Sequence, residues 1–250
     1  MSVRLPVLIF LCLCVASCAS RTMRVPMDSL ANFQSAPAMG RTLLVLLPGA
    51  YDVPKDYFTH GFIGELRDRG LPVDVIAVDA HVDYYTSQTV VERLHEDIIV
   101  PAQGKGYGAI WLAGISLGGF GSLLYVHRHP GVIEGAILLA PYLGARSLTR
   151  DIAQRGGLAR WQPPRNLPLD EEHEMLAWAS ELINSGKDDP RLYIGYSRSD
   201  RFGSVIRVLA DAMPLDRVIA IDGGHDWPTW AILWRRILDR APFAPSRPPG

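Results

Sequence analysis

Residues 114–118 read GISLG, which is the pattern G-x-S-x-G with Ser116 at its centre. An apolar run, AIWLA at 109–113, comes before the pattern, and a segment rich in small residues, GFGS at 119–122, follows it. This order predicts a buried strand, a sharp turn and a helix, with the serine hydroxyl exposed at the turn. Glycines on both sides of the serine suit such a turn, because the backbone passes close to itself there. The stretch therefore predicts that Ser116 is a nucleophile, and a chance match in a chain with 23 glycines is the alternative.

Apolar runs and amphipathic segments alternate on both sides of this turn. Apolar runs typical of strands buried on both faces lie at 42–47, 72–79, 109–115, 134–140, 191–196 and 217–221. Helical patterns lie at 54–69, at 86–100, from the turn to about 129, at 202–212 and at 228–239. About six strands that alternate with helices predict an α/β fold with a doubly wound, mostly parallel sheet.

One interval, residues 145–190, breaks this alternation because it contains no clear strand. It has a proline-rich loop, WQPP at 161–164, and an amphipathic helical pattern at 170–183. We expect a small helical cap over the carboxyl ends of the strands, where ligands bind in open α/β sheets. An excursion that only covers a sheet edge is the alternative.

The composition fits one domain of about 41–240 with a sizeable core. The chain has 250 residues, of which 48% are hydrophobic and 20% are charged. The formal net charge is −1 and the 25 basic residues are scattered, so we expect no nucleic-acid partner. The three cysteines all lie within the first 18 residues, and no His-Glu-x-x-His pattern occurs. We therefore expect no metal site and no cofactor.

The N-terminus has the pattern of an export signal. A short apolar run at 7–15 follows Arg4, and it has the length of a signal-peptide core rather than of a membrane span. Residues 15–18, VASC, resemble the lipobox of bacterial lipoproteins. The resemblance implies that 1–17 is a signal peptide and that a lipidated Cys18 anchors the mature chain in a bacterial cell envelope. An ordinary cleaved signal is the alternative.

Three further expectations concern the chain ends and the membrane. The residue after the lipobox cysteine is not aspartate, which by analogy with enterobacterial sorting favours the periplasmic side of the outer membrane. Residues 18–40 are mixed and non-periodic, and they predict a tether. Residues 241–250 predict a disordered tail.

Residues 42–240 resemble the α/β-hydrolase family, and esterase- or lipase-like members in particular. The resemblance rests on the G-x-S-x-G turn, on the order of the strands and on a late histidine. This family places its catalytic residues in the chain order nucleophile, acid, base. The resemblance implies that Ser116 is the nucleophile. It further implies that Asp200, after the penultimate strand, is the acid and that His225, after the last strand, is the base.

Two other carboxylates flank the predicted base. Asp222 and Asp226 are rivals of Asp200, although a residue so close to His225 in the chain rarely reaches the required ring nitrogen. Asp226 is better explained as the N-cap of the closing helix, because Pro228 lies in the first turn of that helix.

The resemblance also implies an oxyanion hole made of two backbone N–H groups. One comes from Leu117, the residue after the nucleophile, and the other from the loop after the first strand of the domain. We expect Ala50 as the second donor, with Tyr51 as the alternative, because the loop reads PGAY where many relatives have His-Gly. Candidate pocket residues are Tyr51, His81 and Trp227.

These residues together predict a serine hydrolase that cleaves carboxylic esters through an acyl-enzyme. The expected partners are a small-molecule or lipid ester and, through Cys18, a membrane. A thioesterase, peptidase, polyester depolymerase or acyltransferase would use the same three residues, because one fold hosts many reactions. A binding lipoprotein without catalytic activity is the alternative from another class.

Overall fold

A single seven-stranded sheet organises the computed structural model, which describes residues 21–35, 38–164, 170–240 and 242–243. Within these residues the strand order is β1-β3-β2-β4-β5-β6-β7. The strands are β1 (Ser29–Asn32), β2 (Thr42–Leu47), β3 (Val73–Val78), β4 (Ala109–Ile115), β5 (Gly135–Leu139), β6 (Arg191–Ser197) and β7 (Val218–Ile221). Strands β2 to β7 run parallel, and β1 pairs with β3 antiparallel. The prediction of a mostly parallel α/β sheet is confirmed.

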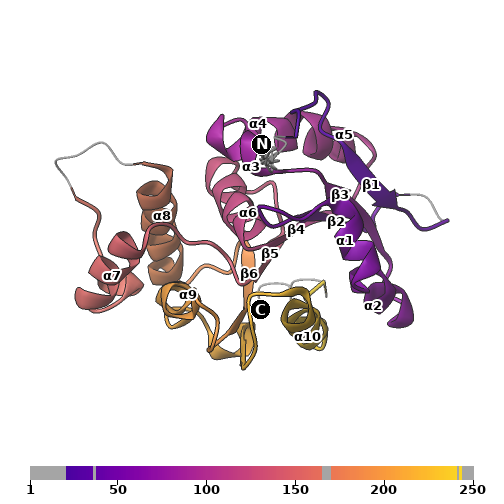
Figure 1. The fold of residues 1–250 in the computed structure, drawn as a ribbon. Coiled ribbons are helices and arrows are strands. Elements are labelled where there is room, and N and C mark those ends of the chain that lie inside the picture. Colours follow the sequence, from indigo (N-terminus) through magenta and orange to yellow (C-terminus); the bar gives the residue numbers. More distant parts are fainter. Residues whose placement is uncertain (1–20, 36–37, 165–169, 241, 244–250) are drawn as a thin grey trace, which may run out of the picture.

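Helices cover both faces of this sheet (Figure 1). They are α1 (Pro54–Thr59), α2 (Phe62–Asp68), α3 (Val82–Thr86), α4 (Val90–Leu94), α5 (Val100–Gly104), α6 (Leu117–Arg128), α7 (Arg146–Gln154), α8 (Glu171–Ser185), α9 (Gly203–Ala210) and α10 (Trp227–Leu238). A π-helical turn, His95–Ile99, joins α4 to α5. Helices α4 and α6 pack together on one face, and α10 packs with α2 and against β6 on the other.

Two predicted helices are divided by residues with positive φ. The predicted helix 54–69 is α1 and α2, separated at Gly61 with a φ of +79°. The predicted helix 86–100 is interrupted at Gln88, with a φ of +59°, so that α3 ends before it and α4 begins after it. An α-helix cannot continue through a residue in this region of backbone space.

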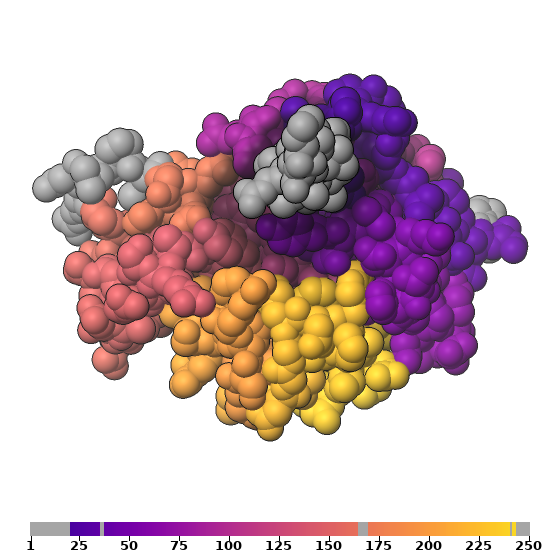
Figure 2. Space-filling view, in the orientation of Figure 1, coloured from indigo at the N-terminus to yellow at the C-terminus, as the bar shows by residue number. Residues whose placement is uncertain are grey.

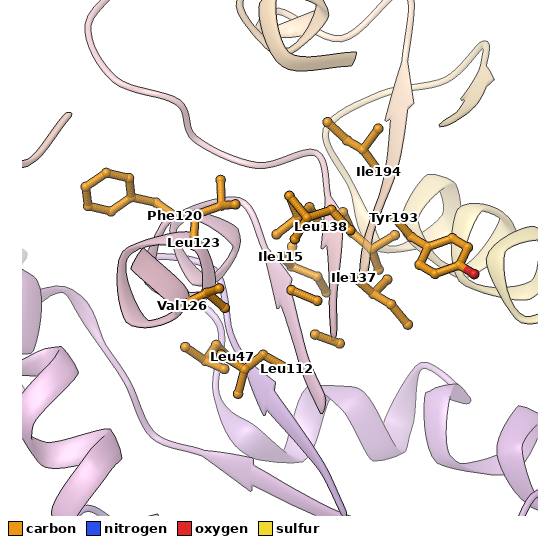
Figure 3. Close-up of a cluster of buried hydrophobic side chains, with 14 of the residues drawn as sticks. Leu47, Leu112, Ile115, Phe120, Leu123, Val126, Ile137, Leu138, Tyr193 and Ile194 are labelled. Carbon is orange, nitrogen blue, oxygen red and sulfur yellow. The ribbon is translucent and has the colours of Figure 1, made fainter. Parts of the chain in front are cut away.

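The core lies on both faces of the central strands, and one part of it lies between these strands and α6. Figure 3 shows leucine, isoleucine and valine side chains of β4, β5, β6 and α6 gathered in one cluster. Every residue of β5 and β6 is buried, and so is every residue of β4 except the first. Strands that are buried on both faces have no polar side, which explains the continuous apolar runs in the sequence. The central strands thus hold the turn after β4 on a rigid base.

The predicted tether at 18–40 is wrong for the residues that the structure describes there. Strand β1 adds to the edge of the sheet beside β3, and Met27 is buried in the core. The Arg21 guanidinium forms an ion pair with Asp79, with 2.7 Å between Nη1 and Oδ1. Cys18 and the predicted signal peptide lie outside the described residues, so lipidation stays a prediction.

The tail prediction also needs a correction. Pro242 is buried, and the ring of Phe243 packs edge-on against Trp111 with ring centroids 5.3 Å apart. The other residues of 241–250 lie outside the described part of the chain.

The interval 145–190 forms a lobe beside the sheet. Helix α8 packs against α6, and α7 packs against α9. Figure 2 shows this salmon-coloured lobe at the left of the molecule, away from the purple helices α1 and α2 at the right. The lobe is helical, as the sequence predicts, and its relation to the site is given below.

Glycine is required at position 118, where the end of β2 passes close to the turn after β4. A Cβ atom built on Gly118 would overlap the backbone carbonyl oxygens of Leu47 and Pro48. We expect Gly118→Ala to lower the free energy of unfolding by about 3 kcal/mol, because backbone atoms on both sides must move apart. Urea unfolding measures the change.

Gly64→Ala is the matched control for this substitution. Gly64 is exposed in α2, and a Cβ atom built there has no neighbour within 4 Å. Alanine should leave the free energy of unfolding unchanged or raise it by up to about 1 kcal/mol, since alanine favours helix over glycine. An unfolding midpoint of Gly118→Ala equal to that of the wild type would contradict the close approach.

Candidate active site

Ser116 occupies the sharp turn between β4 and α6. Its φ of +52° and ψ of −112° are unusual for a residue with a side chain, and such a conformation costs about 1–3 kcal/mol. The turn is held from both sides, because the Ser116 N–H donates to the Leu139 carbonyl at 2.9 Å and the Ser116 carbonyl accepts from the Tyr142 N–H at 2.9 Å. The surrounding backbone therefore enforces the conformation that exposes the hydroxyl.

His225 lies within hydrogen-bond distance of both other predicted catalytic residues. Its Nε2 is 3.0 Å from Ser116 Oγ, and its Nδ1 is 2.6 Å from Asp200 Oδ2. An ionised carboxylate can only accept, so Nδ1 carries the proton and Nε2 is left as an acceptor for the serine hydroxyl. Phe202 and Trp230 each make a T-shaped contact with the imidazole, with ring centroids 5.1 Å apart. These contacts fix the ring orientation.

Asp200 is buried and is held by two hydrogen bonds. Besides the bond from His225, its Oδ1 accepts from the Phe202 N–H at 2.8 Å. Burial alone would raise the pKa of Asp200, but the hydrogen bonds from His225 and Phe202 outweigh it and lower the pKa below its ordinary value. The carboxyl group is therefore ionised at neutral pH.

The loops that carry the acid and the base are tied to each other. Ser197 Oγ donates to the Gly223 carbonyl at 2.6 Å, and the Arg198 N–H donates to the Ile221 carbonyl at 2.8 Å. These bonds join the end of β6 to the end of β7. The relative positions of Asp200 and His225 thus do not depend on their own side-chain contact alone.

The rival carboxylates have other contacts. Asp226 caps α10, with its Oδ1 accepting from the Thr229 N–H at 3.0 Å. Asp222 is exposed and lies 3.7 Å from an Arg198 nitrogen. The structure places only Asp200, of the three, at His225 Nδ1.

The two predicted oxyanion donors come from segments that touch. Leu117 is the first residue of α6, where backbone N–H groups have no partner within the helix. A Cβ atom built on Gly49, the residue before Ala50, would lie 3.7 Å from Ser116 Cβ. Among the described residues, neither the Leu117 nor the Ala50 N–H has a hydrogen-bond acceptor. Both groups are therefore available to a substrate oxygen beside Ser116.

A cavity of about 720 Å³ opens beside Ser116 and His225. Its lining residues are Gly49, Ala50, Tyr51, Asp52, His60, Ser116, Leu117, Tyr142, Arg201, Phe202, His225, Asp226, Trp227, Pro228 and Trp230. The volume lies in the range of sites that bind small molecules. Tyr51 and Trp227, two of the three predicted pocket residues, are among these lining residues.

Two expectations about the surroundings of the cavity do not fit the structure. His81 does not line the cavity; it is buried and packs against Tyr84, with ring centroids 4.7 Å apart. The described residues of the interval, 145–164 and 170–190, also contribute no lining residue. They pack beside the site because α8 rests on α6 and α7 rests on α9.

The comparisons with known proteins agree with this architecture at low sequence identity. No family model matches the chain, and no curated protein matches it. S-formylglutathione hydrolase FrmB from Staphylococcus aureus superposes with a TM-score of 0.57 and 15% identity, over 86% of this chain and 95% of that one. The peroxisomal alpha-beta-hydrolase Lpx1 from Saccharomyces cerevisiae gives 0.54 and 12%, over 85% and 80%.

The chain has the α/β-hydrolase fold. Est1E from Butyrivibrio proteoclasticus is similar to the same extent, with a TM-score of 0.56 and 14% identity over 86% of this chain and 94% of that one. In this fold, Ser116 stands at the turn between β4 and α6.

Sequence reasoning missed two charged residues of this hydrolase-fold cavity, Asp52 and Arg201. The Asp52 carboxyl accepts a hydrogen bond from Trp227 Nε1 at 3.0 Å, and His60 stacks on Trp227 with ring centroids 4.5 Å apart. Burial, with the nearby negative charge of Asp56, raises the pKa of Asp52 against the lowering effect of Trp227. The available signal for Asp52 was its position two residues after Ala50, the predicted oxyanion donor.

The described residues contain no group of three or more His, Cys, Asp or Glu side chains that could hold a metal ion. None of the described helices has the length and hydropathy that crossing a bilayer requires.

Proposed function

We propose that this chain is a serine hydrolase that cleaves carboxylic esters through an acyl-enzyme. The observation that carries the proposal is the hydrogen-bonded series from Ser116 Oγ through the His225 imidazole to the Asp200 carboxylate. A serine hydroxyl is a weak nucleophile alone, and it needs a base within hydrogen-bond distance and an acid that orients that base. Ser116 and His225 line a cavity of small-molecule size, and Asp200 lies behind the imidazole, outside the cavity lining.

The reaction follows from these positions. Ser116 Oγ attacks the ester carbonyl carbon while His225 Nε2 takes the hydroxyl proton, and Asp200 stabilises the resulting imidazolium. The carbonyl oxygen becomes negative and accepts hydrogen bonds from the N–H groups of Leu117 and Ala50. His225 then gives its proton to the leaving alkoxide, which departs as the alcohol. Water attacks the acyl-enzyme in the same way, with His225 as its base, and releases the acid and Ser116.

The names of structural neighbours support hydrolysis without fixing the substrate. They include a fluorophosphonate-binding serine hydrolase, FphF, from Staphylococcus aureus, and Est1E with ferulic acid bound. At 16% and 14% identity, these neighbours share a fold with this chain, and the fold alone hosts many reactions. The lipid anchor at Cys18, and with it a place in a bacterial envelope, remains part of the proposal on sequence grounds alone.

Covalent labelling tests the proposal. A fluorophosphonate probe phosphonylates serine hydroxyls that are activated by a base, so we expect one adduct per chain on the peptide that contains Ser116. Peptide mass spectrometry locates the adduct, and heat-denatured protein is the control for non-specific labelling. A folded protein that never labels at Ser116 would favour the binding lipoprotein instead.

A matched series of substrates separates the candidate reactions. An ester, a thioester and an amide with the same acyl group should be hydrolysed with the ester preferred over the amide, because an amine is the poorer leaving group. A kcat/KM at least as high for the amide would favour a peptidase, and acyl transfer to an added alcohol in preference to water would favour an acyltransferase.

A further inference from the structure

Asp52 is a charged residue of the cavity that also contains the nucleophile. A Cβ atom built on Gly49 would overlap Asp52 Oδ2, and the same position lies 3.7 Å from Ser116 Cβ. The Gly49 backbone is therefore close both to the carboxyl and to the nucleophile. Asp52 is half-buried and lines the same cavity as Ser116 and His225.

This carboxyl has hydrogen-bond donors but no cation. Trp227 Nε1 donates to Oδ1, and the Gly49 N–H is close to the same carboxyl. Among the described residues, no Lys, Arg or His nitrogen lies within ion-pair distance of it. The Arg21 guanidinium is near, but it binds the Asp52 backbone carbonyl and the Asp79 carboxylate. A carboxylate offers about four acceptor positions, so this one retains capacity for a ligand.

A negative charge at this place opposes the proposed reaction unless something balances it. The tetrahedral intermediate carries its own negative charge beside Leu117 and Ala50, and like charges a few ångströms apart in a partly buried site repel. Burial, the largest cause of the raised pKa of Asp52, likewise disfavours the charged form of this carboxyl. A substrate with a positive charge would remove both penalties.

We propose that Asp52 is a specificity-determining residue that binds a cationic group of the ester close to its scissile bond. This inference rests on the proposed hydrolase function and adds the substrate class: esters with an ammonium group on the acyl or the alcohol part. Esters that carry an anionic group at the same position are disfavoured, because the Asp52 carboxylate repels them.

Two matched substrate series test this. The acyl series is ethyl 3-aminopropanoate, ethyl butanoate and monoethyl succinate, which differ in charge at one position. The alcohol series is choline butanoate and 3,3-dimethylbutyl butanoate, which differ only in the charge of the terminal group. We expect the ratio of kcat/KM for cationic over neutral ester to exceed 1 in at least one series, and to fall about tenfold in Asp52→Asn.

Asn is chosen because its amide oxygen can still accept from Trp227 while the charge is removed. The control is Asp222→Asn, which removes an exposed charge near His225 that does not line the cavity, and it should leave the ratio at the wild-type value. Thermal unfolding of each variant checks that it is folded.

The outcomes separate this inference from the function on which it rests. If Asp52→Asn lowers kcat/KM for all esters by one common factor, Asp52 only positions the loop and the inference is wrong. A wild-type enzyme that labels at Ser116 but prefers neutral or anionic esters in both series also overturns it. A protein that neither labels nor hydrolyses any ester overturns the proposed function, and this inference with it.

Discussion

Replacing Ser116 with alanine is expected to lower kcat for 4-nitrophenyl butanoate by about 10⁴-fold to 10⁶-fold. The Oγ atom that forms the acyl-enzyme is then absent, and only the cavity and the oxyanion donors remain. Stopped assays at high enzyme concentration, corrected for the uncatalysed rate, measure the residual activity. We expect burst kinetics at high enzyme concentration in the wild type and no burst in the variant.

The control for this prediction is Ser199→Ala. Ser199 lies in the loop that carries Asp200, is exposed, and does not line the cavity. Its replacement should leave kcat within about twofold, since surface substitutions away from special features have small effects. A Ser116→Ala variant as active as Ser199→Ala would show that another residue is the nucleophile.

Replacing Asp200 with asparagine is expected to lower kcat by about 10⁴-fold at neutral pH. The amide NH₂ of asparagine can donate to His225 Nδ1, which favours the tautomer whose proton lies on Nε2 and points at Ser116. That tautomer cannot take the serine proton. Because hydrogen bonds hold the pKa of Asp200 below its ordinary value, the wild type keeps the carboxylate across the neutral range.

Asp222→Asn is the matched control, because it removes a carboxylate close to His225 that does not contact the ring. Steady-state kinetics and fluorophosphonate labelling rates should both fall in Asp200→Asn and stay near wild type in Asp222→Asn. Equal losses in the two variants would mean that general charge near His225 matters, rather than the hydrogen bond of Asp200 to Nδ1.

The central fold could be predicted because burial leaves a clear pattern in the sequence. A parallel strand between two layers of helices must be apolar on both faces, as β5 and β6 are. Strand β1 left no such pattern. Its four residues are mostly exposed at the sheet edge, so neither alternation nor a long apolar run marks it. Pairing with β3 is a tertiary effect that local sequence does not carry.

The candidate site could be predicted where chain order and loop position decide the geometry. Ser116, Asp200 and His225 each follow a parallel strand, and the carboxyl ends of such strands meet at one edge of the sheet. His81 also follows a strand, β3, yet its side chain turns into the protein beside Tyr84. Strand order limits which loops meet, but it does not determine where each side chain points.

Asp52 could not be predicted because its role depends on a partner far along the chain. Its carboxyl meets the Trp227 indole, 175 residues away, only after β2 and β7 have joined the same sheet.

The position of the interval 145–190 could not be predicted from its sequence either. The amphipathic pattern shows that these helices bury one face, but it does not show against which element. In the structure they pack on α6 and α9 rather than over the cavity.

The contacts of Arg21 bear on how substrates would reach the cavity. Its guanidinium holds the Asp79 carboxylate and the carbonyl of the cavity residue Asp52, at 2.7 Å and 2.9 Å. Arg21 follows Cys18 by three positions, a length of chain that spans at most about 11 Å. If Cys18 carries the predicted lipid, the cavity mouth is held near the headgroups, and substrates dissolved in that leaflet would arrive by two-dimensional diffusion. Hydrolysis would then follow the surface density of the ester rather than its bulk concentration.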